Sequence, residues 1–429
     1  METRRSFLAG SAFLAAARPA RTRIYGTSCS ACCGSLNVKD PAFAGGAKGD
    51  GITNDTAAIQ ACFDTAFGPA SAPHGVANST QNASVYFPPG LYRVGQLTLT
   101  QVFGGHIFGE GTHASMLAWN GGFPRAPRSL LVANGLQDSR IEDIGFDLQS
   151  TRSNPNLTGI NLIGNGPVSA SGNVFSNLGF LNLVGGTCFN LGAGASSNLL
   201  ASIEISNVGV GIKTTDPTAV NNNIIDGTFA SPGAPLIWVA AGSISSVIGG
   251  QWAGNGSTDI GMRIDAGDTT IVGSRSEIFN NWVTINGGSL TMVACVCSAG
   301  GTSGKGFISM SGNQTRVLLD NVNNAGQANG VIVGTGTLEI RASTFTAPGQ
   351  TNPAFAIAGF TGTLTRWRMP NTILANLPAP SASKVGMEVV VTDSGNPATA
   401  ASFGQAVIGG GTNPALVRWN GSAWTVMGV

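Results

Sequence analysis

The chain has 429 residues, and 42% of them are hydrophobic, which is enough apolar material for a large buried core. Only 10% of the residues are charged and the formal net charge is +1, so neither nucleic acid nor an anionic membrane surface is an expected partner. The 62 glycines follow no three-residue period, which excludes a collagen-like chain.

Two arginines precede an apolar run at the start of the chain. Arg4 and Arg5 are followed by Phe7 to Ala17, and small residues with a proline lead to Ala20. This pattern resembles a twin-arginine export signal, to which we assign residues 1–20. The run is shorter than the roughly 20 apolar residues that span a bilayer, so we expect cleavage after Ala17 or Ala20 and no membrane-embedded segment. The expected location is periplasmic or extracellular. The alternative is an ordinary N-terminus that happens to contain two arginines.

Residues 21–36 form a lead-in that contains three of the seven cysteines. An odd number leaves at least one thiol unpaired. Cys29, Cys32 and Cys33 have neither a nearby histidine nor a second cysteine pair at the usual distance, so a zinc site is the weaker interpretation. Three later cysteines lie in apolar, strand-like runs, and we expect them to be small buried hydrophobic residues: Cys188, Cys295 and Cys297.

A glycine-rich turn from Gly46 to Gly51 leads into a predicted helix over residues 55–67. Asn54 or Asp55 could cap its first turn. Apolar residues recur every three or four positions, which predicts one buried face formed by Ile59, Cys62, Phe63, Ala66 and Phe67. We expect this helix to cover the end of the strand-rich body that follows.

The same stretch carries a family resemblance. Gly46 to Gln60, followed by Val85 to Tyr92 and Ile107 to Gly111, resembles the N-terminal segment of the pectate-lyase-like superfamily. That family includes polygalacturonase-type hydrolases, rhamnogalacturonan-active enzymes and phage tailspikes. The resemblance implies an all-β fold, a right-handed parallel β-helix with an N-terminal cap helix, here over residues 37–375. One departure is Asn54, where the family usually has an aspartate.

A weak internal repeat supports this fold. Each unit from about residue 137 to 346 has a short apolar stretch, a polar or glycine turn and a closing large apolar residue, and after a first, longer gap successive units are spaced by roughly 20 to 26 residues. The closing residues Phe180, Ile205, Phe229 and Trp252 should therefore stack as neighbours in the core. A β-sandwich array is the remaining alternative.

The C-terminal segment has a different composition. Residues 376–384 are rich in Pro, Ala and Ser and are read as a linker to a small β module at 385–429. This module resembles the C-terminal modules of phage and prophage tail proteins. Asn420 and Gly421 predict a tight turn, and we expect Trp419 and Trp424 to pair across the hairpin rather than to bind a sugar ring.

Catalytic motifs are scarce. The Asn-Thr-Asp, Asp-Asp, Gly-His-Gly and Arg-Ile-Lys elements of polygalacturonase-type enzymes are absent from this sequence. The three histidines, His74, His106 and His113, precede the repeats and are expected in loops or a lid. Neither a phosphate-binding loop nor a nucleophile elbow occurs in a supporting strand, turn and helix context.

The repeat register nevertheless predicts a candidate site. If each closing residue points inward, the residues one and three before it point outward, because side chains alternate along a strand. The outer strip with the most ionisable side chains contains Glu204 and Asp226, which are the candidate catalytic carboxylates. On a regular strand they would lie about 8 Å apart, within the range of roughly 6.5–9.5 Å for the two carboxyl groups of an inverting glycoside hydrolase. The candidate substrate-binding residues are Gln251, Arg275 and Glu277. The alternative is a solvated surface whose charges prevent edge-to-edge pairing.

Three functions follow from these observations and from the resemblance. The first is an exported lyase or glycoside hydrolase for an acidic or complex polysaccharide. The second is a phage tailspike-like glycan-binding protein or depolymerase, for which the resemblance implies a homotrimer and a virion tail. The third is a catalytically silent, adhesin-like β-helix. No cofactor is firmly implied, although a lyase could use a divalent cation to neutralise a uronate carboxylate.

Overall fold

The computed structural model describes residues 35–68, 84–121, 124, 126–150, 154–230, 235–254, 260–277, 281–298, 307–325, 332–346, 357, 359–372, 374–377, 385, 387–397 and 400–428. Residues Ser35–Val429 form one compact unit. Residues 1–34 lie outside the described part, and with them the predicted export signal and the first three cysteines.

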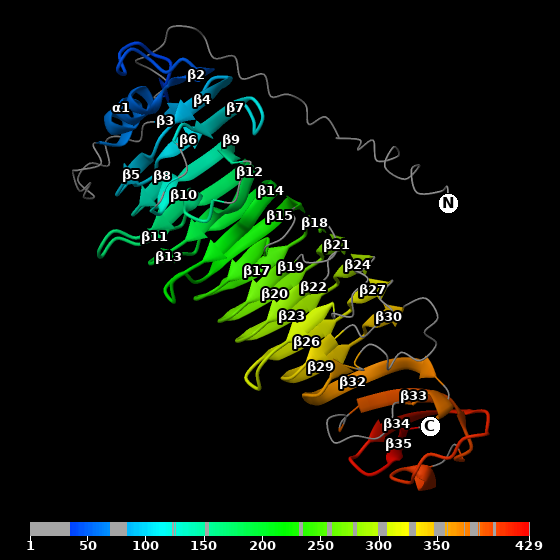
Figure 1. Ribbon diagram of the computed structural model, residues 1–429. Helices are drawn as coiled ribbons and strands as arrows, with labels where there is room; N and C mark the ends of the chain where they lie inside the picture. The colour runs from blue at the N-terminus through cyan, green and yellow to red at the C-terminus, as the bar shows by residue number, and fades with distance from the viewer. Residues whose placement is uncertain are drawn as a thin grey trace, which may run out of the picture. The chain divides into compact units, whose positions relative to one another are not determined.

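Nearly all strands belong to one continuous ladder of parallel pairs, and the chain winds through three outward faces in turn (Figure 1). The first face contains β1 (Ser35–Asn37), β3 (Ser84–Tyr86), β6 (His106–Phe108), β17 (Ile244–Ile248), β20 (Asp268–Val272), β23 (Ser289–Val293), β26 (Arg316–Asp320), β29 (Thr337–Arg341) and β32 (Thr363–Thr372). The second contains β2 (Asp50–Asn54), β4 (Gly90–Val94), β7 (Ser115–Trp119), β18 (Gln251–Ala253), β21 (Arg275–Glu277), β24 (Val296–Ser298), β27 (Asn323–Ala325) and β30 (Thr344–Thr346).

The third face contains β5 (Leu97–Thr100), β8 (Arg128–Asn134), β10 (Leu157–Ile163), β16 (Ile237–Val239), β19 (Ile260–Ile264), β22 (Asn281–Ile285), β25 (Ile308–Met310), β28 (Ile332–Gly334) and β31 (Gly359–Phe360). Four longer strands bend from one face into the next: β9 (Arg140–Ser150), β12 (Val174–Leu191), β14 (Leu199–Thr214) and β15 (Asn222–Ala230). A separate two-stranded pair consists of β11 (Ala170–Ser171) and β13 (Ala195–Ser196). The predicted parallel β-helix is confirmed, and the parallel pairing excludes a β-sandwich.

The predicted core register is also confirmed. Phe180 pairs with Ile205, Ile205 with Phe229, and Phe229 with Trp252. All four side chains are buried. The rings of Phe229 and Trp252 lie 5.0 Å apart, so each coil covers the inward face of the coil before it.

The bend between the first and second faces contains a residue with left-handed backbone in successive coils. The column contains Asp143, Asn177, Ser202, Asp226, Gly249, Gly273, Ala294, Asn321 and Ala342, all with positive φ. Small or amide side chains suit this conformation, because glycine carries no Cβ penalty and Asn and Asp tolerate it better than other residues.

A buried asparagine ladder stabilises the coils at another bend. Asn173, Asn198 and Asn222 are almost fully buried and stand one above the other. The amide of Asn173 donates to Asn198 Oδ1 at 2.9 Å, and the amide of Asn198 donates to Asn222 Oδ1 at 2.9 Å. These amides also satisfy backbone carbonyls that would otherwise be buried without partners.

The cap helix α1 (Thr56–Phe67) lies at the N-terminal end of the stack (Figure 1). Its predicted apolar stripe is buried, and Phe63 contacts Phe87 at 6.2 Å between ring centroids. Asn54 caps the first turn, since its Oδ1 accepts from the N–H group of Thr56, the first helical residue, at 3.1 Å. The carboxylate of Asp55 accepts hydrogen bonds from the backbone N–H groups of Lys48 and Gly49 instead, which holds the glycine-rich turn against the helix.

At the other end, β33 (Met387–Ser394) pairs in parallel with β32 and continues as an antiparallel sheet with β34 (Asn413–Trp419) and β35 (Trp424–Gly428). Short 3₁₀ turns occur at Leu374–Asn376 and Ala400–Ser402. Trp419 and Trp424 pair across the hairpin with ring centroids 5.8 Å apart, as predicted. None of the described helices is long and apolar enough to cross a membrane.

Candidate functional site

The third face carries a polar hollow of about 480 Å³. It crosses β8, β10, β12 and β14, and nine of its eleven lining residues carry an amide, a hydroxyl group or a positive charge: Gln96, Pro127, Arg128, Ser129, Val132, Thr158, Asn161, Thr187, Asn190, Lys213 and Thr215. Asn190 donates to Asn161 Oδ1 at 2.8 Å and accepts from the hydroxyl of Thr215 at 3.1 Å. Such a surface offers fixed donors and acceptors to a hydroxyl-rich ligand.

One outward column continues from this hollow along the stack. Asn190 pairs with Lys213, Lys213 with Trp238, and Trp238 with Arg263. The Lys213 ammonium lies 3.9 Å from the centroid of the Trp238 ring, and the Arg263 guanidinium carbon lies 4.9 Å from it. The strand before Trp238 thus supplies one cation to its ring and the strand after it supplies another.

Asp265 follows β19 and forms hydrogen bonds with two members of this stack, Trp238 and Arg263. Its carboxylate accepts from Trp238 Nε1 at 2.7 Å, from Arg263 Nε at 2.9 Å and from the Asn286 amide at 2.7 Å. Burial alone would raise the pKa of Asp265, but the hydrogen bonds from Arg263, Trp238 and Asn286 together lower it. Asp265 is therefore a fixed carboxylate anion in the neutral pH range.

Lys213 is half-buried beside the hollow. Burial lowers the pKa of its amine, the positive charge of Arg263 lowers it further, and Asp265 opposes these effects. At a given pH, a larger fraction of Lys213 is therefore deprotonated than of a lysine side chain in water. The terminal guanidinium nitrogens of Arg263 have no acceptor among the described residues, because its ion pair with Asp265 uses Nε.

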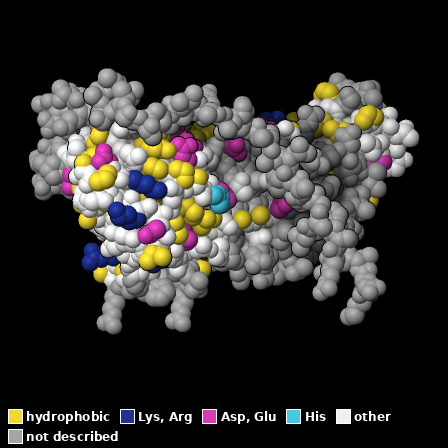
Figure 2. All heavy atoms as spheres, turned by 90° about the horizontal axis from the view of Figure 1, so that it is seen from above, with side chains coloured by type: hydrophobic (Ala, Val, Ile, Leu, Met, Phe, Trp, Pro, Cys, Tyr) yellow, Lys and Arg dark blue, Asp and Glu magenta, His cyan; other side chains and the backbone are white. Residues whose placement is uncertain are grey.

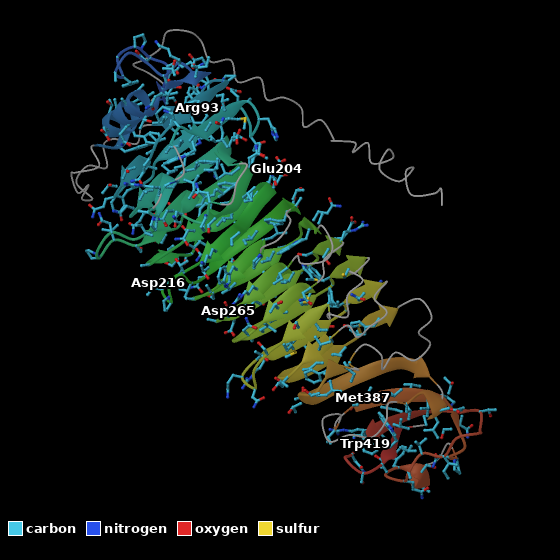
Figure 3. The ribbon with its side chains drawn as sticks, in the orientation of Figure 1. Arg93, Glu204, Asp216, Asp265, Met387 and Trp419 are labelled. Carbon is cyan, nitrogen blue, oxygen red and sulfur yellow. The ribbon has the colours of Figure 1, made fainter. Side chains whose placement is uncertain are left out.

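Four of the five predicted residues lie on the second face: Glu204, Gln251, Arg275 and Glu277. Figure 3 shows Glu204 across the stack from Asp265. Glu204 is on β14 and pairs with Gly179 and with Thr228. It is half-buried, and its carboxylate makes no hydrogen bond or ion pair with another described residue. Because Gly179 and the preceding Gly145 lack side chains, the turn residue Thr112 packs against their outer surface, next to the Glu204 strand.

Asp226 does not follow the strand alternation that the prediction assumed. It occupies the left-handed bend with φ 53°, and its exposed carboxylate accepts from the N–H group of Gly227 at 2.9 Å. The separation of about 8 Å from Glu204, which rested on a regular strand, therefore no longer follows.

The register shifts by two residues in the coil of Arg275 and Glu277. Trp252 pairs with Ser276, whereas the predicted outward positions of Arg275 and Glu277, three and one residues before a closing residue, require residue 278 to close this coil. Arg275 consequently lies beside Gln251, in the Glu204 column, and Glu277 lies beside Ala253. Arg275 and Glu277 form an ion pair of 2.8 Å on this exposed strand.

Two of the histidines fall in the described residues. His106 lies on strand β6, not in a loop as expected, and its Nε2 is 2.9 Å from the Glu142 carboxylate. His113 precedes β7 and contacts the hydroxyl of Thr112 at 2.9 Å. His74 lies outside the described residues.

Buried thiols and the charged surface add no further candidate. Cys62, Cys188, Cys295 and Cys297 are buried free thiols, and burial raises the pKa of Cys295 and Cys297 to about 11. No group of three His, Cys, Asp or Glu side chains that could hold a metal is present in the described part of the chain. In the view from above, charged side chains are scattered among apolar and neutral polar ones (Figure 2).

The sequence prediction missed the third-face column, although a signal was present. Lys213, Trp238 and Arg263 follow each other at intervals of 25 residues, the length of one coil. An aromatic residue flanked by cations at the coil period is the pattern that marks this face.

Comparisons with known proteins agree with the fold. Residues 35–158 match the family described as rhamnogalacturonase A/epimerase, pectate lyase-like. A search of the curated protein sequences found no match.

Several solved structures are similar. A DFA-IIIase from Arthrobacter chlorophenolicus A6, without its lid, is 13% identical with a TM-score of 0.56, over 81% of this chain and 96% of that chain. The Agl-KA catalytic domain is 12% identical with a TM-score of 0.51, over 79% and 70%. The enzymatically active domain of bacteriophage CBA120 tailspike protein 2 is 13% identical with a TM-score of 0.49, over 89% and 59%. At these identities the likeness concerns the fold alone. The resemblance to the pectate-lyase-like superfamily is thus confirmed, with residues 35–158 matching its rhamnogalacturonase A/epimerase group within a parallel β-helix.

Proposed function

We propose that this protein acts on an acidic polysaccharide that lies along the third face, and that it cleaves the chain by β-elimination. The observation that carries the proposal is the pair of cations, Lys213 and Arg263, held on Trp238 beside a polar hollow of about 480 Å³. Anionic sugars need cations at fixed positions, and their hydroxyl groups need amide and hydroxyl partners such as Asn161 and Asn190.

The chemistry follows from the states of these groups. The free guanidinium nitrogens of Arg263 can bind a uronate carboxylate in two parallel hydrogen bonds, which makes the proton on the adjacent carbon more acidic. Lys213 binds as the ammonium in most molecules, and in the fraction that holds it as the neutral amine, which its lowered pKa increases, it takes this proton. The electrons of the C–H bond form a carbon–carbon double bond, the glycosidic C–O bond breaks, and the leaving oxygen takes a proton from water.

Elimination fits the third face better than hydrolysis. Hydrolysis by the usual route needs two carboxyl groups, one as acid and one as base or nucleophile. The described residues of the Lys213 column and of its hollow include no carboxylate, and three hydrogen-bond donors already occupy the carboxylate of the neighbouring Asp265. The matched family, whose description includes pectate lyase-like, supports a polysaccharide as the ligand.

The test is product analysis over a panel of acidic and neutral polysaccharides. We expect unsaturated uronate ends, measured by their ultraviolet absorbance, with an acidic substrate only. Lys213→Gln should abolish the product, and Arg341→Gln, which removes an exposed cation of the first face, should not. Because the pKa of Lys213 is lowered, the wild-type rate should rise with pH through a value below that of an ordinary lysine. Saturated ends from an acidic substrate, or full activity of Lys213→Gln, would contradict the proposal.

A second candidate function is hydrolysis by Glu204 and Asp226 on the second face, with Gln251, Arg275 and Glu277 as sugar contacts. The observation in its favour is that the Glu204 carboxylate is half-buried and not engaged by another described residue. A carboxylate in that state can act as an acid or a base. Saturated reducing ends would identify this route.

We also propose export through the segment of Arg4 and Arg5, which would bring the protein to its polysaccharide outside the cytoplasm. A tailspike-like trimer on a virion is the alternative location. The mass of the native assembly and its site of accumulation distinguish the two.

A further inference from the structure

Asp265 is not among the residues that line the hollow of the third face, but it holds Trp238 and Arg263, which continue the column of the lining residue Lys213. Its two carboxylate oxygens accept from the Trp238 indole N–H, from Arg263 Nε and from the Asn286 amide, at 2.7 to 2.9 Å for the closest contacts. Its side chain is 21% exposed, compared with 39% for that of Arg263. Charge-assisted hydrogen bonds in such a partly shielded place are stronger and better oriented than on an open surface.

Trp238 connects Asp265 to Lys213. The indole ring is held at its N–H group by Asp265, and the Lys213 ammonium lies 3.9 Å from the ring centroid. Lys213 has no direct hydrogen bond to Asp265, so its position depends on the orientation of the ring. Arg263 is held directly, through Nε, with its terminal nitrogens left for a ligand.

We propose that Asp265 is the positioning residue that gives the third face its preference for an acid group, because it fixes Arg263 directly and Lys213 through the Trp238 ring. This inference rests on the proposed function, since it assumes an acidic saccharide on this face. It assigns Asp265 no contact with the substrate and no proton transfer.

Two physical effects of Asp265 on an anionic ligand have opposite signs, which makes the proposal testable. As a negative charge near the cations, Asp265 repels an acidic ligand, so its neutralisation alone would tighten binding. As an anchor, it keeps two cations in place, so its loss would weaken binding through disorder of both. Arg128 also faces the hollow and belongs to the same electrostatic balance.

The experiment compares the affinities of a galacturonate trisaccharide and of its uncharged methyl ester, measured by calorimetry at constant salt. We expect Asp265→Asn to weaken binding of the acid about tenfold, the effect of losing charge-assisted contacts, and to leave the ester unchanged. A merely structural role would weaken both ligands. Asp268→Asn is the matched control, since it removes an exposed carboxylate at the start of strand β20 that accepts from the Ser289 hydroxyl group, and it should not weaken binding of the acid.

Trp238→Phe supplies a variant without a change of charge. It keeps an aromatic ring but removes the N–H donor to Asp265, and it should weaken the acid by a similar factor. Both changes break the hydrogen bond between Trp238 and Asp265. The double variant should therefore bind the acid only slightly more weakly than the single variant with the lower affinity. Tighter or unchanged binding of the acid by Asp265→Asn, or effects that simply add, would overturn the role of Asp265. A wild-type protein that binds the ester as well as the acid would instead overturn the proposed function, and the inference with it.

Discussion

Asn198 offers a test of how the coils are held together. Its side chain is almost fully buried, and its Oδ1 accepts from the backbone N–H group of Asn173 at 3.2 Å and from the Asn173 amide at 2.9 Å. Its own amide donates to Asn222 Oδ1 at 2.9 Å and to the carbonyl of Ala170 at 3.0 Å. In Asn198→Ala, the Asn173 N–H group and the Ala170 carbonyl each lose a buried partner. At roughly 1–3 kcal/mol for each buried group left unsatisfied, the free energy of unfolding should fall by about 2–6 kcal/mol.

The measurement is urea unfolding followed by circular dichroism, or the unfolding rate at fixed temperature if refolding fails. Asn323→Ala is the control, because Asn323 is an exposed residue of strand β27 and its removal should change the free energy by no more than about 0.5 kcal/mol. Asn198→Asp keeps the shape but replaces the amide donor with a carboxyl group that faces two oxygens. Burial would raise the pKa of that carboxyl, so its loss of stability should appear as pH rises above about 4 and diminish in acid. If Asn198→Ala and Asn323→Ala unfold alike, the ladder does not stabilise the coils and the reasoning is wrong.

The remaining predictions concern the second face and export. If hydrolysis occurs at the second face, Glu204→Gln and Asp226→Asn should each abolish turnover without loss of the fold seen by circular dichroism, and full activity in either variant on a proven substrate would place the site elsewhere. Replacement of Arg4 and Arg5 by lysines should stop export from the native host, because the two arginines are read by the export receptor. Periplasmic or extracellular accumulation of that variant would count against the signal, as would a mature protein that does not begin after Ala17 or Ala20.

The core of the parallel β-helix could be predicted because stacked coils require apolar side chains at their inward positions. Phe180, Ile205, Phe229 and Trp252 each close a coil, and a large apolar residue at that position must be covered by the next one. The prediction failed where the core departs from this rule. Ser276 is fully buried below Trp252, so the search for a large apolar residue moved two positions further. Every outward assignment in that coil moved with it.

The left-handed bends account for the error at Asp226. Strand alternation predicts which side chains share a face only while the backbone stays extended. Residues such as Asp143, Asn177 and Asp226 are polar, and nothing in a single coil distinguishes them from an outward strand residue. Their position becomes visible only as a column of Asp, Asn, Ser, Gly and Ala at successive coils, residue types that suit or tolerate positive φ.

The third face was missed for a different reason. Its strands, such as Ile237–Val239, lie between the repeat units from which the register was read. Inward residues of such a strand are dictated by packing, but an outward residue only has to remain soluble. An outward tryptophan that keeps two cations and a carboxylate around it is therefore not required by the fold. In a chain with 10% charged residues, the grouping of Lys213, Arg263 and Asp265 around Trp238 uses charges that stacking does not need, and the charged ligand that we propose for this face would give them a role.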